Sequence, residues 1–171
     1  FIMGGTVAYN KTSEKGQGAG IFIKNGTLEI SGSTSINNNW AAVHGGGIAG
    51  GADAVIIING GSIFSNMAGQ NGQGGGILAG GNVNMTAGTI GGKGQGNTAL
   101  LGGGINLLGA DKTFNMSGGD ITYNTGTGSG GGIYQTAGTI NLSDTANISH
   151  NSGANGGGGL IIRDKLNVFG G

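Results

Sequence analysis

Apolar residues recur along the chain at fixed intervals that favour short strands. An aliphatic residue follows a glycine-rich run in six places, at successive intervals of 27, 29, 28, 28 and 27 residues. These residues are Ile21, Ile48, Ile77, Ile105, Ile133 and Leu160. A fixed period of this length is typical of a solenoid, in which each repeat stacks on the one before. The pattern predicts six coils of about 28 residues.

Each coil carries two further apolar elements. The first is a pair of apolar residues on either side of one other residue: Leu28/Ile30, Ile56/Ile58, Val83/Met85, Phe114/Met116, Ile140/Leu142 and Leu166/Val168. The second is a single aliphatic residue: Val7, Ile36, Ile63, Ile90, Ile121 and Ile148. Alternation at every second residue predicts strands with one buried face, and no helical period occurs. The repeat also lacks the features of leucine-rich and calcium-binding nonapeptide solenoids. We therefore expect an all-β, right-handed parallel β-helix with three short strands per coil.

An asparagine follows the third aliphatic residue by three positions in five of the six coils. These asparagines are Asn10, Asn39, Asn66, Asn124 and Asn151, and Lys93 takes the place in the remaining coil. Asn tolerates a left-handed bend, and identical amides stacked at strand spacing hydrogen-bond to one another. We predict a structural asparagine ladder at this bend. The glycines before each first-strand aliphatic residue are expected to form corners at which the next coil passes closely.

The position after each first-strand aliphatic residue is partly apolar. It holds Phe22, Ala49, Leu78, Asn106, Tyr134 and Ile161. An apolar stripe of this kind marks a contact surface, formed here by Phe22, Leu78, Tyr134 and Ile161, unless other parts of the chain cover it. The alternative is that the variable segment after each bend asparagine folds back over the stripe, as "NWAAVH" at positions 39–44 could do.

Composition excludes several classes of function. The 171 residues include 45 Gly but no Pro and no Cys, and the formal net charge is zero. With 36% hydrophobic residues the chain is too apolar for a disordered segment. There is no basic patch for nucleic acid or for an anionic membrane. No run approaches 18 apolar residues, so we expect no membrane insertion within this segment.

The titratable residues do not form a catalytic pattern. Asp53, Asp111 and Asp164 align between the first and second strands but fall in alternate coils, about 9 to 10 Å apart at the spacing of parallel strands. Glycoside hydrolysis needs two carboxyl groups roughly 5 to 9.5 Å apart, which in a solenoid means matching positions of adjacent coils. The simpler interpretation is that each aspartate lies in a turn and caps its own backbone. His44 and His150 have no acid at a helpful spacing. We expect no catalytic, cofactor or metal site, and thus no enzyme.

The Gly-Gly-Gly-Ile corners and the Ile-x-x-Asn bends resemble the Gly-Gly-Ala-Ile and Phe-x-x-Asn repeats of the polymorphic outer-membrane proteins and of related bacterial autotransporter adhesins. The resemblance spans the whole chain. It implies an extracellular location on the bacterial cell surface, at the outer membrane. It also implies a role in adhesion, with a host-cell or matrix receptor or a glycan as partner.

We expect a non-enzymatic structural or adhesive shaft. Two alternatives remain, a carbohydrate-binding or pectate-lyase-like carbohydrate-processing β-helix and an ice-binding face, although the rank of Thr and Ser at Thr6, Ser35, Ser62 and Thr89 ends at Asp120. The chain opens "FIMGGT" and closes "LNVFGG", so that both ends carry ordinary repeats. We expect residues 1–171 to be one segment of a longer shaft, continued by further coils or by self-association through the coil ends into a filament.

Overall fold

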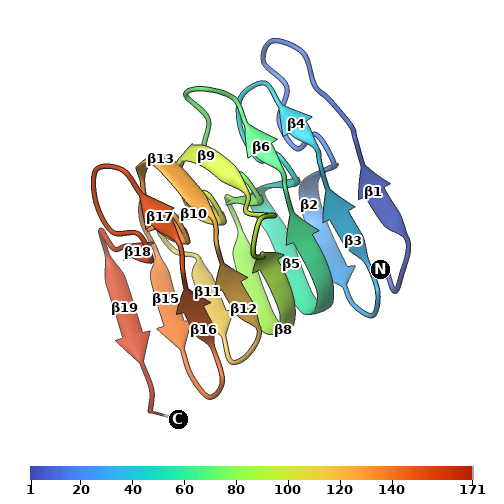
Figure 1. The fold of residues 1–171 in the computed structure, drawn as a ribbon. Coiled ribbons are helices and arrows are strands. Elements are labelled where there is room, and N and C mark those ends of the chain that lie inside the picture. Colours follow the sequence, from blue (N-terminus) through green and yellow to red (C-terminus); the bar gives the residue numbers. More distant parts are fainter. Residues whose placement is uncertain (171) are drawn as a thin grey trace.

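The computed structural model describes residues 1–170 and contains strands, turns and bends but no helix in that range. Figure 1 shows the strands stacked side by side along one axis, from the first coil in blue to the last in red. Every strand pairing within residues 1–170 is parallel; Ile105, for example, pairs with Ile133, which lies 28 positions further along the chain. The chain is therefore a parallel β-solenoid of about six turns, as the repeat predicts.

The strands vary in length because several of them run through a corner and pair on both sides of it. In chain order they are β1 (Thr6–Ala8), β2 (Ile21–Ile30), β3 (Ser35–Asn37), β4 (Trp40–Ala41), β5 (Ile48–Phe64), β6 (Met67–Ala68), β7 (Ile77–Ala79), β8 (Asn82–Gly91), β9 (Thr98–Leu101), β10 (Ile105–Leu107), β11 (Thr113–Met116), β12 (Asp120–Thr122), β13 (Thr125–Ser129), β14 (Ile133–Gln135), β15 (Thr139–Leu142), β16 (Asn147–Ser149), β17 (Ser152–Gly153), β18 (Leu160–Ile161) and β19 (Lys165–Val168).

The predicted alignment of the three apolar elements is confirmed by the strand register. In the first row Ile48 pairs with Ile77, and in the second row Phe114 pairs with Ile140. In the third row Ile36 pairs with Ile63. Like residues therefore lie directly above one another, which is the arrangement that a solenoid with a fixed repeat requires.

These aligned aliphatic residues form one continuous core along the solenoid axis. Ile48, Ile77, Ile105 and Ile133 are fully buried, and so is Phe114, the largest of the enclosed side chains. The inward residues come from all three rows and pack into a single cluster. Burial of each aliphatic side chain contributes roughly 1.5–3 kcal/mol, so the stacked core is the main source of stability.

A fourth row of very short strands adds to the three predicted ones. It forms a separate five-stranded sheet in the order β17-β13-β9-β6-β4. Its inward positions carry only small residues such as Ala41, Ala68 and Ala99, all buried. Small residues give little hydrophobic alternation, so this row left no strand pattern in the sequence. It occupies the segment in which the sequence predicts a variable loop.

Candidate functional site

The predicted asparagine ladder is present and runs through all six coils. The side-chain oxygen of Asn66 accepts two hydrogen bonds from Asn39, one from the backbone N–H at 3.1 Å and one from the side-chain amide at 2.9 Å. The amide of Asn66 also donates to the carbonyl oxygen of Ile36 at 2.9 Å. The same bonds recur at each rung, so the ladder ties each bend to the coils on either side.

Asn97, not Lys93, supplies the rung that the sequence reading left out. Asn97 accepts from the side chain of Asn66 at 3.0 Å and donates to Asn124 at 2.9 Å. Lys93 lies in an exposed turn over residues 92–95, closed by a hydrogen bond from the N–H of Gln95 to the carbonyl of Gly92. This turn is an insertion of four residues between the third-strand Ile90 and its asparagine. The ladder therefore has six members instead of five.

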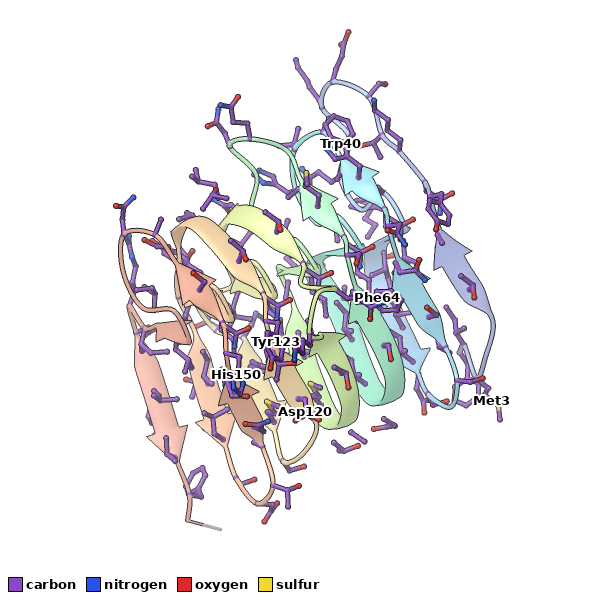
Figure 2. All side chains as sticks on the ribbon, in the orientation of Figure 1. Met3, Trp40, Phe64, Asp120, Tyr123 and His150 are labelled. Atoms are coloured by element: carbon purple, nitrogen blue, oxygen red, sulfur yellow. The ribbon has the colours of Figure 1, made fainter. Side chains whose placement is uncertain are left out.

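The residue before the ladder asparagine takes the left-handed backbone conformation in five of the six coils, with φ values of 59° at Tyr9, 52° at Ser65 and 57° at Tyr123; Gly96 before Asn97 is the exception. The side chains at these positions point outward, and the rings of Tyr123 and His150 stack 4.8 Å apart in neighbouring coils. Figure 2 shows this pair side by side, directly after β12 and β16. The bend therefore buries the asparagine and displays the residue that precedes it.

The glycine runs are explained by the ladder. A Cβ on Gly76 would lie 3.1 Å from the amide nitrogen of Asn97 and 2.7 Å from the carbonyl oxygen of Gly104. The glycine at the same place in the other internal corners is equally close to the ladder, for example Gly47 to Asn66 at 3.0 Å, whereas Gly159 in the last coil has no ladder asparagine near it. Only glycine leaves room for both the amide and the next coil. The corner and bend motifs therefore specify a single packing arrangement.

The four residues predicted as a contact stripe lie in one row but differ in exposure. Leu78 and Tyr134 are each 5% exposed, Ile161 is half-buried, and Phe22 is 58% exposed. The glycine corner lies against this row, since a Cβ on Gly130 would be 2.9 Å from the Cβ of Tyr134. The covering of the stripe by other parts of the chain is thus observed at Leu78 and Tyr134. The accessible part of the stripe is Phe22 at one end.

Asn106 lies in the middle of the same row, between Leu78 and Tyr134. It is fully buried, and neither its amide nitrogen nor its side-chain oxygen has a hydrogen-bond partner in the part of the chain that the structure describes. Buried polar atoms without partners destabilise a fold, so this residue is the least favourable side chain of the row.

A second, exposed asparagine column lies on the outer face of the second row. Asn115 donates to Asn84 at 2.8 Å, and Asn141 donates to Asn115 at 2.7 Å. Asn167 continues the column by donating to Asn141. These residues hold the outward place between two apolar neighbours, and this repeated place accounts for the Asn-x-Ser/Thr sequences that begin at Asn84, Asn115 and Asn141.

The three aligned aspartates and His44 lie in different environments. Asp53 and Asp111 are exposed, and the carboxylate of Asp164 accepts from the backbone N–H of Gly138 at 2.9 Å. The Nδ1 of His44 accepts from the backbone N–H of Gln73 at 3.1 Å, and burial lowers the pKa of His44 below its ordinary value of 6.5. Within residues 1–170 no three acidic or histidine side chains gather where they could hold a metal ion.

A hollow of about 480 Å³ opens on the outer face of the fourth row. It is lined by Trp40, Met67, Ala68, Gly69, Gln70, Thr98 and Thr127. We call it the Trp40 groove. Figure 2 shows Trp40 at β4, on a different part of the coil from Asp120 and the Tyr123–His150 pair.

The Trp40 groove was missed in the sequence, although its signal was present. Trp40, Met67 and Thr98 each follow a ladder asparagine directly, and they pair with one another in β4, β6 and β9. Because Lys93 was aligned in place of Asn97, Thr98 did not fall into line with Trp40 and Met67. With Asn97 taken as the ladder residue, the alignment of these three residues is visible in the sequence, although their row has no hydrophobic alternation that would predict a strand.

No family model, curated protein or solved structure matches the chain. Within the described residues no helix is long and apolar enough to cross a membrane. The geometry of the coils, the ladder and the groove is therefore the basis for a functional proposal.

Proposed function

We propose that this chain is a non-enzymatic shaft segment of a bacterial cell-surface or secreted protein, and that its outer faces serve adhesion. The observation that supports the proposal best is the unbroken ladder from Asn10 to Asn151, which joins all six coils and is buried at its four inner members, from Asn39 to Asn124. A column of this kind, wrapped around one continuous core, suits a stiff rod.

The difference between the inward positions, which are alike from coil to coil, and the outward positions, which vary, also favours this role. The inward positions hold the aliphatic core, the ladder and the tightly packed glycines, all of which serve the stacking of coils. The outward positions after the ladder asparagines differ from coil to coil, from Trp40 to Met67 to Thr98. A rod built in this way can vary its surface without altering its core.

The corner and bend motifs support a bacterial surface location through their resemblance to the repeats of polymorphic outer-membrane proteins and autotransporter adhesins. On this proposal the partner is a receptor or glycan of a host cell or matrix. The chain presents its faces to that partner and performs no chemistry on it.

The proposal is tested by coupling the 171-residue chain to beads and measuring their attachment to epithelial cells and to immobilised matrix. Beads that carry an unrelated β-rich protein of the same size and zero net charge are the control. We expect saturable attachment that the soluble chain inhibits. Attachment equal to that of the control beads would contradict the adhesive role.

A second measurement tests the non-enzymatic part of the proposal. The chain is incubated with pectin, xylan and other plant and bacterial polysaccharides, and new reducing ends and unsaturated products are measured. We expect neither to rise above the level of the substrate alone. A steady release of products that scales with protein concentration would make the chain an enzyme.

A further inference from the structure

The Trp40 groove has the size of a small-molecule site. Its volume of about 480 Å³ lies within the range of roughly 300–1,000 Å³ that ligand pockets occupy. Ala68 at the end of β6 and the following Gly69 are part of the lining, and because one carries only a methyl group and the other no side chain, they leave the backbone close to the opening. The walls come from three successive coils, because Trp40, Met67 and Thr98 lie in register.

Trp40 lies at one end of the groove, between Lys11 on one side along the axis and the other lining residues, beginning with Met67, on the other. The ammonium group of Lys11 lies over the indole ring, 4.6 Å from its centroid. Lys11 and Met67 pair with Trp40 from opposite sides along the axis. The cation therefore covers the side away from the groove and holds the ring in place.

The polar part of the lining carries no charge. Gln70 offers an amide, which both donates and accepts hydrogen bonds, while Thr98 and Thr127 each offer a hydroxyl group. The hydroxyl of Thr127 donates to the carbonyl of Ala99 at 3.3 Å, which leaves its oxygen as an acceptor. An acidic or basic ligand would find no opposite charge among these residues.

We propose that the Trp40 groove binds a neutral oligosaccharide. A sugar ring has an apolar face, which packs on an indole, and a rim of hydroxyl groups, which pair with amides and hydroxyls. Trp40 supplies the platform, and Gln70, Thr98 and Thr127 supply the polar rim. This inference rests on the proposed adhesive function and names the ligand class that one face of the shaft takes.

The test uses the fluorescence of Trp40, which is the only tryptophan in the chain. The intact 171-residue chain is titrated with cello-, xylo-, malto- and chito-oligosaccharides, with oligogalacturonate as the charged comparison. We expect at least one neutral series to give a saturable shift of the emission to shorter wavelength and to protect Trp40 from acrylamide quenching. The charged series is expected to give neither effect.

Two variants locate the binding site. Thr98→Val keeps the branched side chain that suits a strand and removes one hydroxyl, so we expect binding to weaken by about 3- to 10-fold. Trp40→Ala, measured by calorimetry because it lacks the reporter, should weaken binding by at least about tenfold. The matched control is Thr113→Val on β11, in the second row of strands, which should bind like the parent chain.

Three outcomes would overturn the proposal. They are the absence of any saturable effect with neutral oligosaccharides at millimolar concentration, preference for the charged series, and equal binding by Thr98→Val and Thr113→Val when both variants have the circular dichroism of the parent. Attachment of coated beads to cells without sugar binding would leave the adhesive function standing and the groove proposal wrong. Sugar binding without attachment of the beads would leave the groove proposal standing and contradict the adhesive function.

Discussion

Asn66 donates two hydrogen bonds to the side-chain oxygen of Asn97, from its backbone N–H at 2.9 Å and from its amide at 3.0 Å, across a separation of 31 residues. Elsewhere in the ladder from Asn39 onward the same contact spans 27 residues. The ladder thus keeps its geometry although one coil is four residues longer. The surplus residues leave the coil as a turn, so the position of the amide, not the length of the repeat, sets the register.

Substitution of a central ladder residue should destabilise the whole solenoid. In Asn66→Ala, the backbone and side-chain donors of Asn39 lose their acceptor, while Ile36 and Asn97 lose a donor. Each buried polar group left without a partner costs about 1–3 kcal/mol, so we expect a loss of at least about 3 kcal/mol in the free energy of unfolding. Denaturant titration followed by circular dichroism measures it.

The matched control for that variant is Asn115→Ala in the exposed outer column. Asn115 bonds to Asn84 and Asn141 in the same repeating manner, but water can replace these bonds. We expect a change below about 0.5 kcal/mol, as for most surface substitutions. Equal losses in the two variants would mean that burial of the ladder does not determine its contribution.

Deletion of residues 92–95 should be tolerated. The deletion removes the exposed turn that contains Lys93 and restores the three-residue interval from Ile90 to the ladder asparagine, now reached through Gly91 and Gly96. Surface turns of this length contribute little to stability, so the free energy of unfolding should change by about 1 kcal/mol or less. The shortened chain should keep the parent circular dichroism spectrum and melting temperature, and aggregation or loss of β-structure would contradict the prediction.

The fold could be predicted from the sequence because the features that define it are periodic. Inward aliphatic residues such as Ile48 and Ile77 recur at the interval at which they stack, so periodicity alone gives their register. The ladder was predicted for the same reason at Asn39 and Asn66. The rung at Asn97 was missed because a fixed interval cannot describe an insertion.

Periodicity alone did not predict the candidate site, the Trp40 groove. The fourth row has small inward residues such as Ala41 and Ala68, which give no hydrophobic alternation. The burial of Leu78 and Tyr134 depends on the path of the glycine corners over them, and that path is a property of the folded chain. Periodicity therefore predicts what stacks, whereas exposure of an outward residue requires the structure.

Glycine should be required for full stability directly before the first-strand aliphatic residue of an internal coil, but not at the same position of the last coil. In Gly76→Ala the new methyl group would lie 2.7 Å from the carbonyl oxygen of Gly104 and 3.1 Å from the amide of Asn97. Relief of such contacts typically costs about 1–3 kcal/mol. Gly159 holds the same place in the last coil, where the nearest atom is 4.0 Å away, so Gly159→Ala should change stability by less than about 0.5 kcal/mol. Similar melting temperatures for both variants would show that the coils relax around a methyl group.

The His44 ring should make stability depend on pH just below neutrality. Burial lowers the pKa of His44 in the folded chain, so the unfolded chain binds this proton first as the pH falls below about 6.5. The contribution of His44 to the free energy of unfolding is complete above about pH 6.5. It declines as the pH falls from there to below the pKa of His44 in the folded chain, and then stays constant. Protonation also removes the acceptor that receives the Gln73 N–H. Unfolding midpoints between pH 7.5 and 5 should therefore fall less in His44→Asn, whose oxygen accepts without titrating, and parallel curves would exclude this role.

Replacement of Asn106 by leucine should stabilise the protein. Asn106 is fully buried on β10 between Leu78 and Tyr134, and both polar atoms of its side chain lack partners within residues 1–170. Leucine at the equivalent place in the neighbouring coil is accommodated with 5% exposure, which indicates that the row has space for it. Removal of the unpaired amide should raise the free energy of unfolding by about 1–3 kcal/mol. The reverse change, Leu78→Asn, should lower it by a similar amount, because it places a second unpaired amide under the glycine corner. Denaturant titrations of both variants measure the two effects, and a less stable Asn106→Leu would mean that the row is too tightly packed for the larger side chain.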